Sequence, residues 1–291
     1  MAASFTAQTM ALHRVLESAR PAETRLFVDP LAGAFLSPPL RGLARVARLP
    51  VVGGVVERLY DTVMPGPRPS AIARTRLIDD TIREQVADGV GQIVVLGAGF
   101  DSRAWRLTEL RNVRVIEVDQ PATQQAKTDA VRQAGHDTER VRFLPVDFET
   151  DDLATALRDA GAQGLRTLFV WEGVTNYLTA DAVDRTLAVL RVVAGPGSAL
   201  LFTFVHIGVI DGSTTFPEAE RWVRNVSRVG EPWTFGLDPD QLTGYLTERG
   251  YQPVWEESTA AAGHRYFPPL GRADRASELY RVALARISCP A

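Results

Sequence analysis

The stretch Gln92-Ile-Val-Val-Leu-Gly-Ala-Gly-Phe-Asp-Ser-Arg103, followed by Val115-Ile-Glu-Val-Asp-Gln-Pro121, decides the fold of this chain. A short apolar run leads into a glycine turn, and a second apolar run ends on two carboxylates. A parallel α/β sheet builds a nucleoside-binding crevice in this way, at the carboxyl ends of its strands. The stretch therefore predicts the crevice as well as the sheet.

Apolar runs that alternate with helical patterns continue this arrangement on both sides of the stretch. They predict an α/β fold with a doubly wound, mostly parallel, seven-stranded sheet. The expected strands are residues 93–96, 113–118, 141–144, 168–171, 199–204, 253–256 and 280–287. The clearest helical patterns run from about 70 to 87, 121 to 134 and 180 to 193, and a further helix begins at Asp238-Pro239 and ends at Gly250.

Two regions lie outside this alternation. Residues 1–68 mix short helical patterns with breakers such as Ser37-Pro38-Pro39, and we expect an irregular, partly helical lid before a nucleoside-binding domain at 69–291. Residues 206–237 contain Phe216, Trp222, Trp233 and Phe235, and we expect an insertion over the carboxyl ends of the strands. Its aromatic side chains fit an apolar pocket or a small core beneath a long loop.

Composition narrows the class of protein. The chain has 291 residues, 45% of them hydrophobic, and a net charge of −3, so it can bury a large core but has no basic field for nucleic acid or an anionic membrane. Its lone Cys289 cannot form an internal disulfide, and the N-terminus does not resemble a signal peptide. We expect a cytoplasmic protein that is a monomer or a homodimer.

The glycine turn is more consistent with a nucleoside than with a dinucleotide. Gly97, Ala98 and Gly99 would let a ligand approach the bare backbone. A dinucleotide fingerprint has Gly or Ala at its sixth position, where this chain has Ser102, and Asp101 would repel a phosphate. S-adenosylmethionine is a common nucleoside ligand without phosphates. Taken alone, however, the turn is equally well explained as a tight strand-to-helix connection.

Carboxylates follow the second, third and fourth expected strands. Glu117 and Asp119 lie two residues apart, hence on one side of an extended strand, where they can accept the hydroxyls of a ribose. Asp147 and Phe148 end the third strand and fit the amine and ring of an adenine, although a plain strand end also explains them. Glu172 ends the fourth strand, where a carboxylate needs a partner.

Five motifs in this order and spacing resemble the leucine carboxyl methyltransferase family, especially its bacterial branch of small-molecule and polyketide O-methyltransferases. They are Ala73-Arg-Thr-Arg-Leu-Ile-Asp-Asp80, Val95-Leu-Gly-Ala-Gly-Phe-Asp-Ser-Arg-Ala-Trp-Arg-Leu107, Glu117-Val-Asp-Gln-Pro121, Val146-Asp-Phe148 and Glu172-Gly-Val-Thr-Asn-Tyr-Leu178. The resemblance implies a class I methyltransferase fold and S-adenosylmethionine as the methyl donor, without a metal. The segment from Ala19 to Phe35, with Arg25 and Asp29-Pro30, resembles the part that closes over the acceptor.

The resemblance also implies roles for single residues. Arg74, or else Arg76, grips the cofactor carboxylate, since a guanidinium binds a carboxylate with two hydrogen bonds. Glu172 lies near the ribose, the methionyl amine or the methyl group, and Tyr177 lies near the acceptor. The remaining implied cofactor contacts are Gly97, Gly99, Asp119, Asp147 and Phe148. A phosphatase peptide, the substrate of some family members, is not carried over to this chain.

The acceptor decides whether a base is needed. A carboxylate is already ionised at pH 7, whereas a phenol with a pKa near 10 requires a general base. His206 follows the fifth strand and is the candidate base, although a histidine there also fits a structural role. We therefore expect an O-methyltransferase that forms a methyl ester, with methylation of a phenol or alcohol through His206 as the alternative.

Three other classes compete with this interpretation. A nicotinamide-dependent oxidoreductase is disfavoured by Asp101 and Ser102. A nucleic-acid amine methyltransferase is disfavoured because the fourth strand ends in Trp171-Glu-Gly-Val174 and the charge is not basic. A cofactor-binding protein without catalysis stays open at this stage.

Overall fold

The structure is a computed structural model that describes residues 5–46, 50–63, 66–228 and 230–288. Cys289 lies outside these ranges. A seven-stranded sheet runs through the centre in the order β3-β2-β1-β4-β5-β7-β6. The first five strands are parallel, and β7 is antiparallel to both β5 and β6. The strands are β1 Gln92–Leu96, β2 Arg114–Asp119, β3 Val141–Pro145, β4 Thr167–Trp171, β5 Ala199–Val205, β6 Tyr251–Ser258 and β7 Tyr280–Ile287.

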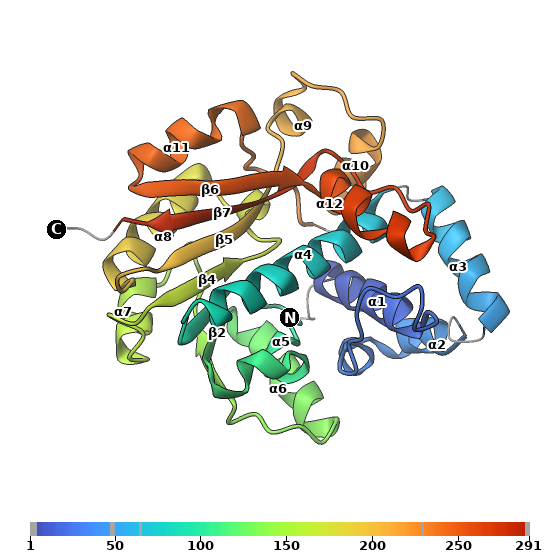
Figure 1. Cartoon of the computed structure of the whole chain (residues 1–291), viewed down its shortest axis with the longest axis horizontal. Coiled ribbons are helices and arrows are strands. Elements are labelled where there is room, and N and C mark those ends of the chain that lie inside the picture. The colour runs from blue at the N-terminus through green and yellow to red at the C-terminus, as the bar shows by residue number, and fades with distance from the viewer. Residues whose placement is uncertain (1–4, 47–49, 64–65, 229, 289–291) are drawn as a thin grey trace.

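Helices cover both faces of the sheet (Figure 1). On one face α7 Leu153–Asp159, α8 Ala180–Val193 and α11 Leu242–Glu248 pack on alternate strand residues. On the other face lie α4 Pro67–Ala87, the short α5 Arg103–Arg106 and α12 Thr259–Tyr266. Helix α6 Pro121–Gln133 follows β2, at the end of the sheet that carries β3. Because helices cover the central strands on both sides, β1, β4 and β5 are buried along their whole length rather than on alternate residues.

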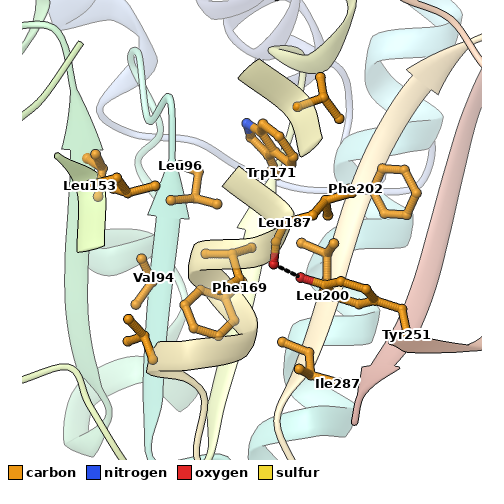
Figure 2. Close-up of a cluster of buried hydrophobic side chains, with 14 of the residues drawn as sticks. Val94, Leu96, Leu153, Phe169, Trp171, Leu187, Leu200, Phe202, Tyr251 and Ile287 are labelled. Atoms are coloured by element: carbon orange, nitrogen blue, oxygen red, sulfur yellow. Dashed lines mark hydrogen bonds between the residues drawn. The ribbon is translucent and has the colours of Figure 1, made fainter. Parts of the chain in front are cut away.

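Figure 2 shows the core beneath α8. Phe169 and Leu200 point from neighbouring strands toward Leu187 of α8, with Val94 of β1 beside them. Tyr251 fills the far end of this cluster, and its hydroxyl donates to the Leu187 carbonyl at 2.7 Å, so that the one polar atom of this buried ring has a partner. The cluster fixes the direction of the parallel strands and hence the position of their carboxyl ends.

The N-terminal region is more regular than the sequence indicated. Residues 5–63 contain α1 Phe5–Ala19, α2 Pro38–Val46 and α3 Pro50–Val63, and Figure 1 places them beside α4 at the end of the molecule toward which β6 runs. The breakers misled the expectation because Pro38, Pro50 and Pro67 each stand at the first position of a helix. Proline is favoured there, because its missing N–H would be unpaired in any case.

The expected insertion forms two short helices, α9 Gly208–Asp211 and α10 Ala219–Arg228. A β-bridge between His206 and Leu237 closes its base against the end of β5. Arg221, Arg224 and Arg228 are spaced three and four residues apart and lie on one exposed face of α10, whereas Trp222 is buried.

Candidate active site

A cavity of about 1000 Å³ lies at the carboxyl ends of β1, β2 and β4. This volume is at the upper end for small-molecule sites, so it has room for a cofactor together with an acceptor. Its wall is shared between the sheet, the N-terminal helices and the insertion. The lining residues used below are Met10, His13, Arg14, Tyr60, Arg74, Gly97, Ala98, Gly99, Asp101, Arg103, Asp119, Asp147, Phe148, Glu172, Val174, Tyr177, Trp222, Trp233 and Tyr280.

The glycine turn forms the floor of the cavity. Gly97 and Gly99 have φ angles of 63° and 47°, in the left-handed region that side chains avoid. A Cβ atom at Gly97 would also overlap the Val174 side chain, which approaches from the loop after β4. The turn therefore needs glycine at position 97 for both backbone and steric reasons.

Asp119 lies directly beside this turn. Its carboxylate accepts hydrogen bonds from the backbone N–H of Gly99 at 2.5 Å and of Gln120 at 2.6 Å. Burial raises its pKa, and the two N–H groups oppose that change. The side chain thus presents acceptor atoms to the cavity from a fixed position, as ribose binding requires.

Glu117 does not share that position, and the expectation of paired ribose carboxylates is corrected for this residue. Glu117 is 1% exposed, does not line the cavity, and forms an ion pair with Lys127 of α6. Two residues along a strand span about 6.6 Å, so a shared side of the strand does not mean a shared site. Burial raises the pKa of Glu117 to about 7, against the attraction of Lys127.

Glu172 lies at the centre of a buried chain of charges. Its carboxylate accepts from Arg74 Nε at 2.7 Å and from Arg103 Nη1 at 2.8 Å, and the same Arg103 nitrogen donates to Asp101 at 2.6 Å. Burial alone would raise the pKa of Glu172, but Arg103 and Arg74 lower it below its ordinary value. The partner that this carboxylate was expected to need is therefore a pair of arginines.

Asp101 also has a lowered pKa, because Arg103 outweighs the effect of burial. Behind it, Asp79 of α4 accepts from Arg103 Nε at 2.7 Å and from Arg106. Neither Arg103 nor Asp79 was predicted from the sequence to have a role in the site. Both lie inside quoted motifs, but nothing in their spacing marked them as partners.

Only one of the two candidate arginines reaches the site. Arg74 lines the cavity and stacks its guanidinium over the ring of Tyr280 at 4.7 Å. Arg76 lies outside the cavity lining, paired with Asp80 at 2.8 Å and donating to the Leu26 carbonyl at 2.9 Å. The geometry thus favours Arg74, which lines the cavity beside Glu172.

Asp147 and Phe148 line the cavity next to Asp119, beyond the end of β3. Asp147 Oδ1 accepts from the Glu149 N–H at 2.9 Å, and Phe148 packs against Trp171 with ring centroids 6.4 Å apart. These two side chains are placed together, as expected for groups that flank one ring.

The expected residues of the acceptor side divide into two groups. Tyr177 lines the cavity, and burial raises its pKa to about 12, so its hydroxyl keeps its proton. His206 does not line the cavity: its Nδ1 accepts from the Gly208 N–H at 3.0 Å, and its ring packs edge-on against Phe216. The geometry does not support His206 as a base, because the turn at the start of α9 holds its ring away from the crevice.

The N-terminal segment contributes in a way that the sequence did not reveal. Within the described ranges, no residue from Ala19 to Phe35 lines the cavity, which differs from the expected closure over the acceptor. Asp29 is buried instead and accepts from Ser102 at 2.6 Å and Arg14 at 2.8 Å. Ser102, at the position where a dinucleotide fold has glycine, thus ties this segment to the turn. The N-terminal part of the lining comes instead from α1, α2 and α3 and includes His13 and Tyr60, for which the sequence carried no signal.

Only some of the aromatic rings of the insertion line the cavity. Trp222 and Trp233 line the cavity, with ring centroids 6.3 Å apart. Phe235 belongs to the core, and Phe216 packs with His206 outside the cavity. Phe216, Trp222 and Trp233 thus form a small core beneath the insertion, two of whose rings also line the cavity, whereas Phe235 joins the main core.

Within residues 5–46, 50–63, 66–228 and 230–288, no group of three His, Cys, Asp or Glu side chains is placed to hold a metal ion. No helix there is both long and apolar enough to cross a bilayer.

The strand order and the crevice are those of a class I methyltransferase. A solved structure described as a methyltransferase from Thermobifida fusca has the same fold, with a TM-score of 0.60 and 18% identity over 94% of this chain and 97% of that one. Residues 7–191 match the leucine carboxyl methyltransferase family.

Curated relatives agree with that match. A Streptomyces coelicolor protein named as an S-adenosyl-L-methionine-dependent methyltransferase is 34% identical over 264 residues, which cover 85% of this chain and 82% of that protein. A Streptomyces avermitilis protein of the same description is 32% identical over 288 residues, covering 93% and 91%. The chain belongs to the leucine carboxyl methyltransferase family, and it is an S-adenosylmethionine-dependent methyltransferase.

Proposed function

We propose that the protein methylates the carboxylate of a small, largely apolar molecule and so forms a methyl ester. The observation that carries this proposal is the state of the histidine in the cavity. His13 is the single histidine among the described residues that line it, and burial together with nearby arginines lowers its pKa to about 3. Such a ring is a poor acceptor for the proton of a phenol or an alcohol.

The tyrosines on this side support the same conclusion. Burial raises the pKa of Tyr60 and of Tyr177 to about 12, so neither phenolate is available near neutral pH. Glu172 and Asp101 are already engaged by arginines. A carboxylate acceptor needs no base, because it is ionised at pH 7. The family description, which names carboxyl methylation, points the same way.

The residues of the cofactor half fit S-adenosylmethionine. Asp119 would accept from the ribose hydroxyls, and Asp147 with Phe148 would flank the adenine. Arg74 would bind the carboxylate of the cofactor, and Glu172 would accept from the cofactor's ammonium group. The ion pair between Arg74 and Glu172 would then be replaced by one ion pair from each residue to the cofactor. Gly97, Ala98 and Gly99 would let the methionine part lie against the backbone.

Bound S-adenosylmethionine supplies an electrophilic methyl group on a positively charged sulfur. The chain's own contribution is to hold the acceptor oxygen in line with that methyl and to keep water out. Trp222, Trp233 and Tyr177 would form an apolar wall for the acceptor. We propose that residues 1–68 act as a lid and that the insertion at 206–237 covers the acceptor, because α1, α3 and α10 all contribute lining residues.

The test is transfer of labelled methyl groups from S-adenosylmethionine into a metabolite extract of the source organism, followed by mass spectrometry and mild base. We expect a labelled product that releases methanol in base, as an ester does. A base-stable product would be an ether and would contradict carboxyl methylation.

The matched control is His206→Ala, because this histidine lies outside the cavity. We expect the variant to keep its cofactor affinity and its turnover within about twofold. A large loss of turnover with intact cofactor binding would restore the alternative in which His206 serves as a base for a hydroxyl acceptor.

A further inference from the structure

A histidine and a tyrosine from two N-terminal helices form a pair in the wall of the cavity. His13 of α1 and Tyr60 of α3 both line it, and the imidazole Nε2 lies 2.9 Å from the tyrosine hydroxyl. The rings meet edge to face, at 74° and 5.3 Å between centroids. His13 is 0% exposed, so the pair is built into the protein rather than resting on its surface.

The second ring nitrogen of His13 is left without a partner. Nδ1 is buried and makes no hydrogen bond to any described residue. Buried polar atoms are nearly always paired, and leaving one unpaired is costly. An unpaired atom in the wall of a substrate cavity therefore points to a ligand that completes it.

The hydrogen-bond partners of the ring indicate whether Nδ1 is a donor or an acceptor. The ring is neutral at pH 7, because burial and the charges of Arg68, Arg74 and Arg14 lower its pKa to about 3. A neutral ring has one N–H and one bare nitrogen. If Nε2 carried the hydrogen, both the Tyr60 hydrogen and the bare Nδ1 would lack partners. If Tyr60 donates to Nε2, only the N–H on Nδ1 lacks one, so this tautomer is favoured.

The donor itself favours one charge for the missing partner. The nearby arginines are already paired with carboxylates, Arg14 with Asp29, Arg74 with Glu172 and Arg68 with Asp61. An N–H donor without such a partner forms a stronger hydrogen bond to a negatively charged oxygen than to a neutral hydroxyl.

We propose that the Nδ1–H of His13, oriented by Tyr60, binds the acceptor carboxylate through the oxygen that does not receive the methyl. This inference rests on the proposed carboxylate acceptor and names a residue that recognises it. The other carboxylate oxygen forms the new C–O bond as the methyl–sulfur bond breaks, and the electron pair of that bond stays on sulfur. Anion and cation thus become a neutral ester and a thioether, and no proton moves. His13 is accordingly a specificity residue that is not a base.

Nuclear magnetic resonance of protein labelled with ¹⁵N-histidine tests the tautomer without any acceptor. We expect the His13 signal, assigned by its loss in His13→Asn, to show a protonated Nδ1 and a bare Nε2 near pH 7. In Tyr60→Phe we expect a mixture of tautomers. A bare Nδ1 in the wild type overturns the proposal.

Substitutions test the recognition of the acceptor. The probes are a panel of aryl and alkyl carboxylic acids, each compared with the corresponding alcohol. His13→Leu removes the donor, and we expect the KM for acids that the wild type methylates to rise by about 10- to 100-fold, as for a lost hydrogen bond to a charged group. The kcat and the affinity for S-adenosylhomocysteine should change less than threefold. His13→Asn, whose amide nitrogen can take the place of Nδ1, should recover much of the loss.

The control is His264→Leu, a histidine on the exposed side of α12. We expect its KM to match the wild type. A His13→Leu enzyme that methylates acids with the wild-type KM overturns the role of His13, whereas methylation of the alcohols in place of the acids overturns the proposed function instead.

Discussion

Gly97 shows how much of this site depends on single residues. Its φ angle of 63° suits glycine, and the space where a Cβ would lie is occupied by Val174. Two separate costs therefore oppose any side chain here, one in the backbone and one in packing. Both act on the loop that we propose to hold the methionine part of the cofactor.

We predict that Gly97→Ala destabilises the fold by about 1–3 kcal/mol and weakens S-adenosylhomocysteine binding at least tenfold. In a Val174→Ala background the loss of stability should shrink, because only the backbone cost remains. Urea unfolding and calorimetric titration would measure both effects in a double-mutant cycle.

Gly135→Ala is the matched control for this prediction. Gly135 also has a positive φ angle, of 78°, but open space surrounds its Cβ position, and it follows α6 outside the cavity lining. We expect a modest loss of stability and unchanged ligand affinity. Equal effects of Gly97→Ala and Gly135→Ala on stability and ligand affinity would show that the contact with Val174 and the place in the cavity do not matter.

At the residue scale, the sequence predicted side chains at strand ends better than partners from distant segments. Asp119, Asp147 and Glu172 line the cavity because the carboxyl ends of parallel strands meet at one edge. Glu117 was wrongly placed with them, because Lys127 comes from another element and pattern alone does not reveal it. His13 and Tyr60 lie 47 positions apart, and no periodicity connects them.

At the scale of elements, ion pairs hold α3 to the rest of the molecule. Arg68 at the start of α4 donates to Asp61 of α3 and to Asp274, each at 2.5 Å, and Glu57 of α3 lies 3.8 Å away. Arg20 binds Glu57 as well. Burial raises the pKa of Glu57, whereas Arg272 and Arg68 lower that of Asp274 to about 2, against the effect of its burial.

We predict that Arg68→Met loosens α3. The change leaves Asp61 without its Arg68 partner and removes one of the arginines that contact Glu57 and Asp274, and breaking a buried pair costs up to about 3–5 kcal/mol. Detachment of α3 would avoid that cost by returning its carboxylates to water. Hydrogen exchange should therefore speed up in peptides from residues 50–63 and stay unchanged in β4.

Arg83→Met provides the comparison on the same helix. Arg83 is about one-third exposed and pairs with Asp80 and Glu109 at the surface, where such pairs are worth at most about 1 kcal/mol. Its exchange pattern should match the wild type. Equal exchange in α3 for both variants would show that Arg68 does not hold this helix.

Elements were predictable where they repeat the strand-and-helix alternation. The five parallel strands appear within two residues of their expected bounds. A short, buried apolar run that ends at a glycine or a carboxylate seldom forms anything other than a strand. The N-terminal helices were harder, because their prolines resemble breaks and their packing surfaces belong to other segments. Helix α1 packs on α4 and on η1 (Ala32–Phe35), contacts that the sequence does not encode locally.

At the scale of the whole molecule, the cavity joins both ends of the chain to the sheet. Arg14 comes from α1, Trp222 from α10 and Tyr280 from the start of β7, and all three share one cavity with Asp119. The family resemblance implied the class I fold, which is confirmed. For the acceptor side it indicated only Tyr177 and the segment from Ala19 to Phe35, because the shape of that side depends on how the N-terminal helices and the insertion meet.

This shared wall predicts that cofactor binding stabilises distant elements together. At 100 times its Kd, S-adenosylhomocysteine should add about 2.7 kcal/mol to the free energy of unfolding, and the Tm should rise by roughly 5–10 °C. NAD at the same concentration should leave the Tm unchanged, because Asp101 faces the place that a pyrophosphate would take. Hydrogen exchange should slow in α1 and α10 as well as at the glycine turn, since a bound ligand limits opening of every segment that encloses it. Protection confined to the turn, with α1 and α10 unaffected, would mean that the N-terminal helices and the insertion do not close over the cofactor, and the lid role proposed for them would then be wrong.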